Sequence, residues 1–162
     1  MQEEFWGRSG IVSGAKWGTV GSLFKGEHHY SLDDKGRVVL PPKFRRALGA
    51  TVVVTRGLDE CVFVYSPQEW SKFESKLRSL SINKRDFVRF MLASAEDVDV
   101  DRQGRMMIPA HLRAYAKIDR DAVVVGVINR LEIWGRENWL KYIQKAQAET
   151  PRLAAEMEEL SI

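Results

Sequence analysis

The chain contains one short motif twice, as DDKGRVVLP at residues 33–41 and as DRQGRMMIP at residues 101–109. The two copies are 68 positions apart, and the similarity extends beyond them. Downstream of the motif, the matched segments are Val52–Val54 with Val123–Val125, and Trp70 with Trp139. A repeat at nearly constant spacing indicates two copies of one structural unit.

The repeat divides the chain into five expected segments. These are a flexible N-terminal extension at 1–22, a first repeat at 23–80, a connecting helix at 81–94, a second repeat at 95–149 and a C-terminal tail at 150–162. Residues 1–22 are rich in Gly and Ser and show no apolar period. Phe87, Phe90 and Met91 recur at helical spacing, which predicts the connecting helix.

Each repeat is predicted to form a strand, a turn, a strand, a short helix, two more strands and a final helix. Tyr30 and Leu32 alternate with polar residues, which is the period of a half-buried strand. Asp33 followed by Gly36 favours a type I turn, because Asp accepts hydrogen bonds from turn amides and Gly tolerates positive φ. Asp101–Gly104 predicts the same turn in the second repeat.

These elements predict an α+β fold. Neither repeat is large enough to bury both of its faces alone, so we expect the two to pack as one unit, with Trp70 and Trp139 at equivalent buried positions. Ser66 is expected to cap the helix that ends the first repeat. Pro151 is expected to end the last helix, before a further short helix at 152–160.

The composition indicates a globular protein. Of the 162 residues, 44% are hydrophobic and 29% are charged, which is too apolar for intrinsic disorder. No run of about 18 uncharged apolar residues occurs, so no membrane partner is expected. The single cysteine, Cys61, cannot form an internal disulfide, and the first residues lack the basic start of a signal peptide. We therefore expect a cytoplasmic protein.

Positive charge is concentrated at the repeated turn. Residues 33–46 hold five Lys and Arg against two Asp, and residues 101–113 hold three Arg against one Asp, whereas the whole chain carries only +3. Two basic turns at equivalent places form a paired cationic surface that suits a DNA duplex. The alternative is a solvated turn in which Asp33 pairs with Arg37 and Asp101 pairs with Arg105.

The chain resembles the MraZ family. The residues that carry this resemblance are Leu23-Phe24-Lys25-Gly26-Glu27, Asp33-Asp34-Lys35-Gly36-Arg37 and Pro41-Pro42-Lys43-Phe44-Arg45, then Asp101-Arg102-Gln103-Gly104-Arg105 and Asn129-Arg130-Leu131-Glu132-Ile133-Trp134. The resemblance implies two AbrB-like swapped-hairpin repeats in one pseudo-two-fold, β-barrel-like unit with flanking helices. It also implies a ring-like homo-oligomer at the nucleoid, which binds G-containing direct repeats upstream of the division and cell-wall gene cluster and regulates transcription, as a repressor.

The same resemblance implies the DNA-binding residues. They are Asp33, Lys35, Gly36 and Arg37 in the first repeat, and Asp101, Arg102, Gln103, Gly104 and Arg105 in the second. Arg37 and Arg105 are expected to make the main DNA contacts, with Lys35 at phosphates. Gln103 stands where the first repeat has Lys35, which predicts unequal contributions from the two turns.

No catalytic, metal or cofactor site is expected. Asp97, Asp99 and Asp101 resemble the start of a calcium loop, but Arg102 stands where that loop needs Gly, so the carboxylates are expected on the solvent side of a strand. His28 and His29 are adjacent on a predicted strand and therefore face opposite ways. Cys61, next to Val62, is expected to be buried. No phosphate-binding loop or nucleophile elbow occurs.

A rival hypothesis is a structural or antitoxin-like oligomeric module that binds protein partners. In that case the basic turns only keep the assembly soluble. A DNA shift assay at several salt concentrations would separate the two hypotheses.

Overall fold

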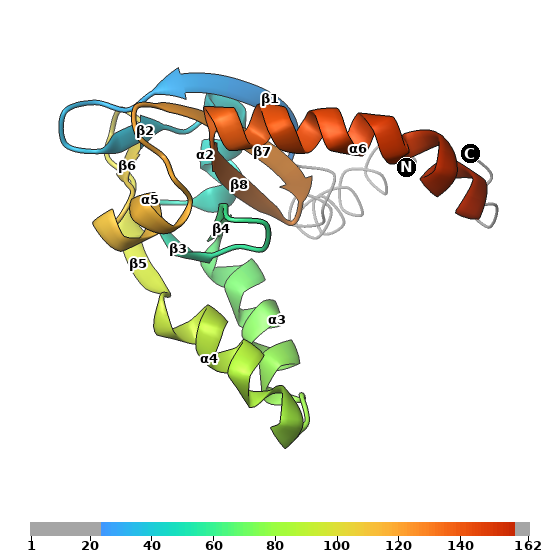
Figure 1. Ribbon diagram of the computed structural model, residues 1–162. Coiled ribbons are helices and arrows are strands. Elements are labelled where there is room, and N and C mark those ends of the chain that lie inside the picture. The colour runs from blue at the N-terminus through green and yellow to red at the C-terminus, as the bar shows by residue number, and fades with distance from the viewer. Residues whose placement is uncertain (1–23, 158–162) are drawn as a thin grey trace, which may run out of the picture.

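The structure is a computed structural model that describes residues 24–157 (Figure 1). The first repeat contains β1 (Phe24–Ser31), β2 (Arg37–Val39), α2 (Pro42–Leu48), β3 (Thr51–Arg56), β4 (Val62–Tyr65) and α3 (Pro67–Arg78). A 3-10 turn, η2 (Ile82–Lys84), and α4 (Arg85–Ala93) follow. The second repeat contains β5 (Glu96–Asp99), β6 (Arg105–Met107), α5 (Ala110–Tyr115), β7 (Asp121–Ile128), β8 (Arg130–Gly135) and α6 (Arg136–Glu156). The predicted order of elements is confirmed in both repeats.

The strands form one six-stranded antiparallel sheet and one two-stranded ribbon. The sheet has the order β1-β7-β8-β4-β3-β5, and the ribbon pairs β2 with β6. Exchanging the two repeats gives the same strand order read in the opposite direction. The reason is that the first strand of each repeat pairs with the third strand of the other. The fold is therefore α+β, as predicted.

The expected barrel-like closure is not confirmed. Within residues 24–157 the sheet is open, with β1 and β5 as its outer strands. The reason lies in the turns that follow β1 and β5. They direct β2 and β6 away from the sheet, and these two strands then pair with each other across its face.

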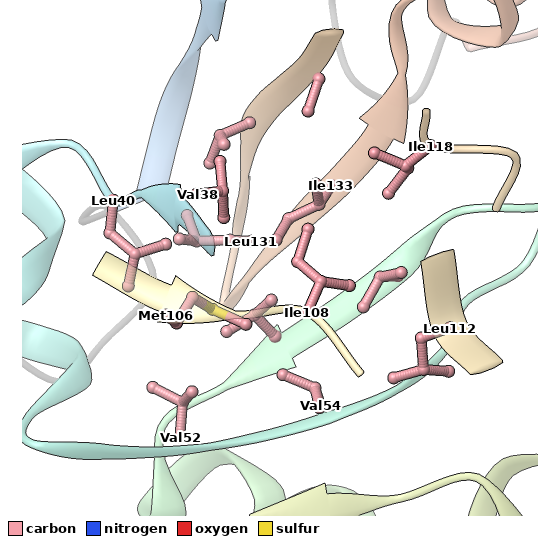
Figure 2. Close-up of a cluster of buried hydrophobic side chains, with 14 of the residues drawn as sticks. Val38, Leu40, Val52, Val54, Met106, Ile108, Leu112, Ile118, Leu131 and Ile133 are labelled. Atoms are coloured by element: carbon pink, nitrogen blue, oxygen red, sulfur yellow. The ribbon is translucent and has the colours of Figure 1, made fainter. Parts of the chain in front are cut away.

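The ribbon covers a core to which both repeats contribute. Val38 and Leu40 from the first repeat, and Met106 and Ile108 from the second, are fully buried against sheet residues such as Ile133 (Figure 2). Burying one such side chain contributes about 1.5–3 kcal/mol. The two repeats therefore pack as one unit, as expected.

The opposite face of the sheet carries a second cluster, in which the two matched tryptophans differ. Trp139 is buried and packs against Trp134, with ring centroids 5.3 Å apart. Trp70 is only half-buried, so the expectation of equivalent buried positions is wrong. Trp70 lies on α3, which leads away from the sheet (Figure 1), and its ring packs against the cluster at Tyr65 and Phe73.

The helix ends confirm one expectation and correct another. Ser66 caps α3, because its hydroxyl accepts a hydrogen bond of 3.2 Å from the Glu69 amide. The expected break at Pro151 is wrong, since α6 continues to Glu156. Proline removes only one backbone donor, and the carbonyl it leaves free belongs to Gln147, on an exposed stretch where water can replace the bond.

Part of the chain lies outside the described residues. The expected flexible extension at 1–22 falls there entirely. Residues 158–162 of the expected tail also fall there, and they include the last three residues of the short helix expected at 152–160. Residues 150–156 of that tail belong to α6, and Met157 follows as its C-cap. None of the helices between residues 24 and 157 is both long enough and apolar enough to cross a bilayer.

Candidate nucleic-acid interface

The first turn, Asp33–Arg37, is held by the side chain of its first residue. Asp33 Oδ1 accepts hydrogen bonds of 2.9 Å from the backbone amides of both Lys35 and Arg37. The Gly36 amide donates to the Asp33 carbonyl at 3.0 Å. Gly36 has φ +79°, a conformation that residues with a Cβ rarely adopt. The predicted turn chemistry is therefore present.

The second turn, Asp101–Arg105, repeats this geometry. Asp101 Oδ1 accepts hydrogen bonds of 2.9 Å from the amides of Gln103 and Arg105. The Gly104 amide donates to the Asp101 carbonyl at 2.9 Å, and Gly104 has φ +78°. Two unlike sequences thus build the same turn, because both keep the Asp, the Gly and the Arg at the same spacing.

Each turn arginine also pairs with its turn aspartate. Arg37 Nε donates to Asp33 Oδ2 at 2.6 Å, and Arg105 Nε donates to Asp101 Oδ2 at 2.9 Å. Arg105 Nη1 lies 4.0 Å from Asp33 Oδ2, which links the two turns. The ion pairs expected for a solvated turn are thus present. Because these pairs use Nε, they fix the orientation of each guanidinium group and leave its terminal nitrogens out of the hydrogen bond to its own aspartate.

These contacts lower the pKa of both aspartates. The Arg37 backbone amide, assisted by the Arg37 guanidinium and the Lys35 amide, holds the pKa of Asp33 below its ordinary value. The Arg105 amide, its guanidinium and the Gln103 amide do the same for Asp101. Both carboxylates therefore stay ionised at neutral pH, and the turns keep their geometry there.

The ribbon places both turn arginines on one face. Arg37 lies opposite Met107, and Arg105 lies opposite Val39. Because side chains alternate along a strand, the buried positions of β2 and β6 point toward the core and these four side chains point outward. Hydrogen bonds from Leu40 N to the Gly104 carbonyl (2.8 Å) and from Ile108 N to the Gly36 carbonyl (3.0 Å) extend the pairing to the turns. The turns thus lie at the two ends of one ribbon.

The fold brings all the expected turn residues together at this ribbon. Lys35, Arg102 and Gln103 are exposed, whereas Gly36 and Gly104 are buried beneath their turns. Arg37 and Arg105 keep 27% and 31% of their side-chain surface exposed. The arginines are therefore both anchored and accessible from solvent.

Two further arginines belong to this site and were not predicted. Arg45 Nε donates to the Leu40 carbonyl at 2.9 Å, and Arg113 Nε donates to the Ile108 carbonyl at 3.1 Å. Arg45 lies against Gly104, and Arg113 lies against Gly36. The two arginines occupy matched places in the repeats, but sequence spacing alone does not reveal that each contacts the opposite turn.

The other polar candidates are dispersed. Asp97 and Asp99 lie exposed on β5, as expected, and Asp99 accepts a hydrogen bond of 3.2 Å from the Thr51 hydroxyl. His28 is half-buried and its neighbour His29 is exposed, in agreement with their predicted alternation. Cys61 is fully buried. Between residues 24 and 157, no group of three or more His, Cys, Asp and Glu residues is arranged to hold a metal ion.

Comparisons with known proteins agree with this architecture. The family model "MraZ protein, putative antitoxin-like" matches the chain twice, at residues 23–90 and 91–160. The chain is 45% identical over 143 residues to a protein of Moorella thermoacetica, and 46% identical over 143 residues to proteins of Halothermothrix orenii and Natranaerobius thermophilus. Each alignment covers 86% of this chain and 100% of the relative, and each relative is named transcriptional regulator MraZ. The chain therefore belongs to the MraZ family of transcriptional regulators.

Proposed function

We propose that this chain is a sequence-specific DNA-binding repressor of the division and cell-wall gene cluster, acting at the nucleoid. One observation carries the proposal, namely that the ribbon presents Arg37 and Arg105 on a single outward face. The family to which the chain belongs is one of transcriptional regulators, which supports a DNA-binding role.

The ribbon has the chemistry needed to contact base pairs in the major groove. That groove admits a two-stranded β-ribbon, and arginine pairs with the O6 and N7 atoms of guanine. Arg37 and Arg105 supply this donor pattern, which suits the G-containing direct repeats implied by the family resemblance. Val39 and Met107 lie on the same face and add apolar contact area of the kind that thymine methyl groups accept.

Phosphate contacts follow from the exposed turn residues. Lys35 and Arg102 lie exposed at the turns that flank the ribbon. Each phosphate that such a residue neutralises releases counterions, so affinity falls as salt rises. Gln103 carries no charge at the place of Lys35, which supports unequal phosphate contacts by the two turns.

We also propose a ring-like homo-oligomer. Leu140, Tyr142 and Ile143 on α6 are 48%, 41% and 40% exposed, and Ile128 is 66% exposed. Apolar side chains this accessible favour burial between copies of the chain. Several copies acting on repeated operator sites add avidity without new contacts per subunit.

The test is a DNA shift assay with a labelled duplex from the region upstream of the division and cell-wall gene cluster. Binding should resist an unlabelled mixed-sequence competitor and weaken as salt rises. A reporter behind the same region should lose expression when the protein is supplied. Light scattering should return a mass several times 18.5 kDa, and a mass of 18.5 kDa would contradict the oligomer. Equal affinity for the competitor would refute sequence-specific binding, and no binding at low salt would favour the protein-binding, antitoxin-like module.

A further inference from the structure

Arg45 and Arg113 form a second pair of matched arginines beneath the ribbon. Arg45 belongs to α2 of the first repeat, and Arg113 belongs to α5 of the second. Both side chains are half-buried. Each Nε is fixed by a hydrogen bond to the carbonyl that follows the ribbon strand of its own repeat, at Leu40 and Ile108.

The guanidinium group of each arginine then packs against the turn of the opposite repeat. A Cβ atom built on Gly104 would lie 2.0 Å from Cζ and Nε of Arg45. A Cβ atom built on Gly36 would lie 2.7 Å from Cζ of Arg113. Such distances show that the arginines occupy the space in which a turn side chain would lie. The absence of a side chain at each Gly therefore serves this contact as well as the positive φ.

The crossing follows from the register of the ribbon. Because Leu40 N donates to the Gly104 carbonyl, the end of β2 lies beside the second turn. Arg45 holds the Leu40 carbonyl and so reaches that turn. Ile108, Gly36 and Arg113 repeat the arrangement at the other end of the ribbon.

We propose that Arg45 and Arg113 are positioning residues that act across the repeats, so that Arg45 sets the DNA-binding geometry of the second turn and Arg113 that of the first. The inference rests on the proposed DNA-binding function and deepens it. Each binding turn is composite, since one repeat supplies the aspartate and arginine that face DNA and the other supplies the arginine beneath them.

The crossing also exchanges one arginine between the turns. Sequence position assigns Arg45 to the basic segment 33–46, but its guanidinium group lies at Gly104. The second turn therefore combines the charge of Arg45 with those of Arg102 and Arg105. Arg113 crosses the other way, to Gly36, so each turn keeps the number of cations counted along the sequence, but one of them comes from the opposite repeat.

A double-mutant cycle tests the crossing directly. Arg45→Ala is combined with Arg105→Lys and, separately, with Arg37→Lys, and binding to the labelled upstream duplex is measured at low salt, where weak variants remain measurable. We expect the loss of affinity in the double variant Arg45→Ala/Arg105→Lys to differ from the product of the two single-variant losses by about two-fold or more. The double variant Arg45→Ala/Arg37→Lys combines Arg45 with a residue of the first turn, so its loss of affinity should equal the product of the two single-variant losses. Arg113→Ala should show the reverse pattern.

Hydrogen exchange followed by mass spectrometry gives a measurement that does not need DNA. Arg45→Ala should accelerate exchange in residues 101–105 and leave residues 33–37 unchanged, and Arg113→Ala should do the opposite. Arg46→Ala is the matched control, because it removes the same charge from the adjacent, exposed position of α2. It should change neither segment.

Arg45→Lys separates positioning from charge. It keeps the charge and the aliphatic stem but loses the Nε donor to Leu40, so it should behave like Arg45→Ala in both experiments. It also serves if Arg45→Ala does not fold. Full recovery by Arg45→Lys, or faster exchange mainly in residues 33–37 of Arg45→Ala, would overturn the inference. If the wild-type chain does not bind the duplex, the proposed function fails, while the exchange pattern still decides the crossing.

Discussion

Val38 of β2 lies directly opposite Met106 of β6, and both side chains are fully buried. The register is symmetric about this pair, with Arg37 opposite Met107 on one side and Val39 opposite Arg105 on the other. The residues that fix the ribbon thus come equally from both repeats. Stability and the placement of the two arginines therefore depend on the same pair.

Met106→Ala should destabilise the whole chain in a single step. Deleting a buried Met side chain leaves a cavity, so the free energy of unfolding should fall by about 2–5 kcal/mol. Urea unfolding followed by circular dichroism and by tryptophan fluorescence should give coincident transitions, because the repeats share one core. Met107→Ala is the matched control, since Met107 is 46% exposed, and it should stay within about 0.5 kcal/mol of wild type. Two separate transitions in wild type would contradict the shared core.

Arg37→Ala should lose binding to the upstream duplex while the oligomer and its melting temperature stay nearly unchanged. Removing an arginine that contacts a guanine costs about 1–3 kcal/mol per site, and repeated sites multiply the loss. Arg105→Ala should behave alike. Arg78→Ala is the control, because Arg78 is an exposed arginine on α3, paired only loosely with Glu74 at 3.8 Å.

The ion pair between Arg37 and Asp33 allows a different result for Arg37→Ala, which would contradict this prediction. If Arg37→Ala unfolds or fails to assemble, the pair is structural and the solvated-turn interpretation holds. Asp33→Asn sharpens the comparison, since it keeps an acceptor for the turn amides but removes the charge that holds the guanidinium group. Unchanged DNA binding in both Arg37→Ala and Arg105→Ala would place the site elsewhere.

Acid should weaken the two turns. The folded-state pKa of Asp33 and of Asp101 is lowered, chiefly by the backbone amides of Arg37 and Arg105. Such groups stabilise the fold above the ordinary Asp pKa of about 3.9, and the contribution is lost as pH falls through the lower folded-state value. The doubly substituted chain Asp33→Asn/Asp101→Asn lacks this titration. Its deficit in unfolding free energy relative to wild type should be constant near neutral pH and shrink below about pH 4, as urea titrations at successive pH values would reveal. A deficit that does not vary with pH would be inconsistent with this assignment.

Local spacing predicted the elements and turns of this chain, but not how they pair. Asp33 and Gly36 are three residues apart, so their turn chemistry is readable from the sequence. The contact of Arg45 with Gly104 depends on the pairing of β2 with β6, which no local pattern encodes. The open sheet and the half-buried Trp70 likewise result from where distant elements meet. The helix through Pro151 was missed because a single proline is tolerated where the freed carbonyl is exposed.

Cys61 should resist thiol reagents in the folded protein. Burial raises the pKa of its thiol far above the ordinary value, and its Sγ lies 3.1 Å from the Leu58 carbonyl. Modification therefore requires the site to open, and at pH 8 it should be at least about 10³-fold slower than in urea-unfolded protein. The single cysteine makes the readout unambiguous. Rapid labelling of the native chain would mean that this end of β4 opens locally.

Gly104→Ala should destabilise the chain more than Gly36→Ala. Both glycines have nearly the same positive φ, +78° and +79°, so both substitutions incur a similar backbone cost of about 1–2 kcal/mol. The steric cost differs, because the new Cβ would lie 2.0 Å from Cζ of Arg45 at Gly104 but 2.7 Å from Cζ of Arg113 at Gly36.

The decisive measurement repeats both substitutions in the Arg45→Ala background. There the obstruction at Gly104 is gone, so the unfolding free energy lost through Gly104→Ala should fall to the backbone cost alone. The loss through Gly36→Ala should not change, because its new Cβ still meets Arg113, and it should now be the larger of the two. Urea unfolding of the six chains supplies every term of this comparison. A loss through Gly104→Ala that is the same with and without Arg45 would show that the guanidinium group yields freely, and that the backbone alone requires glycine at this turn.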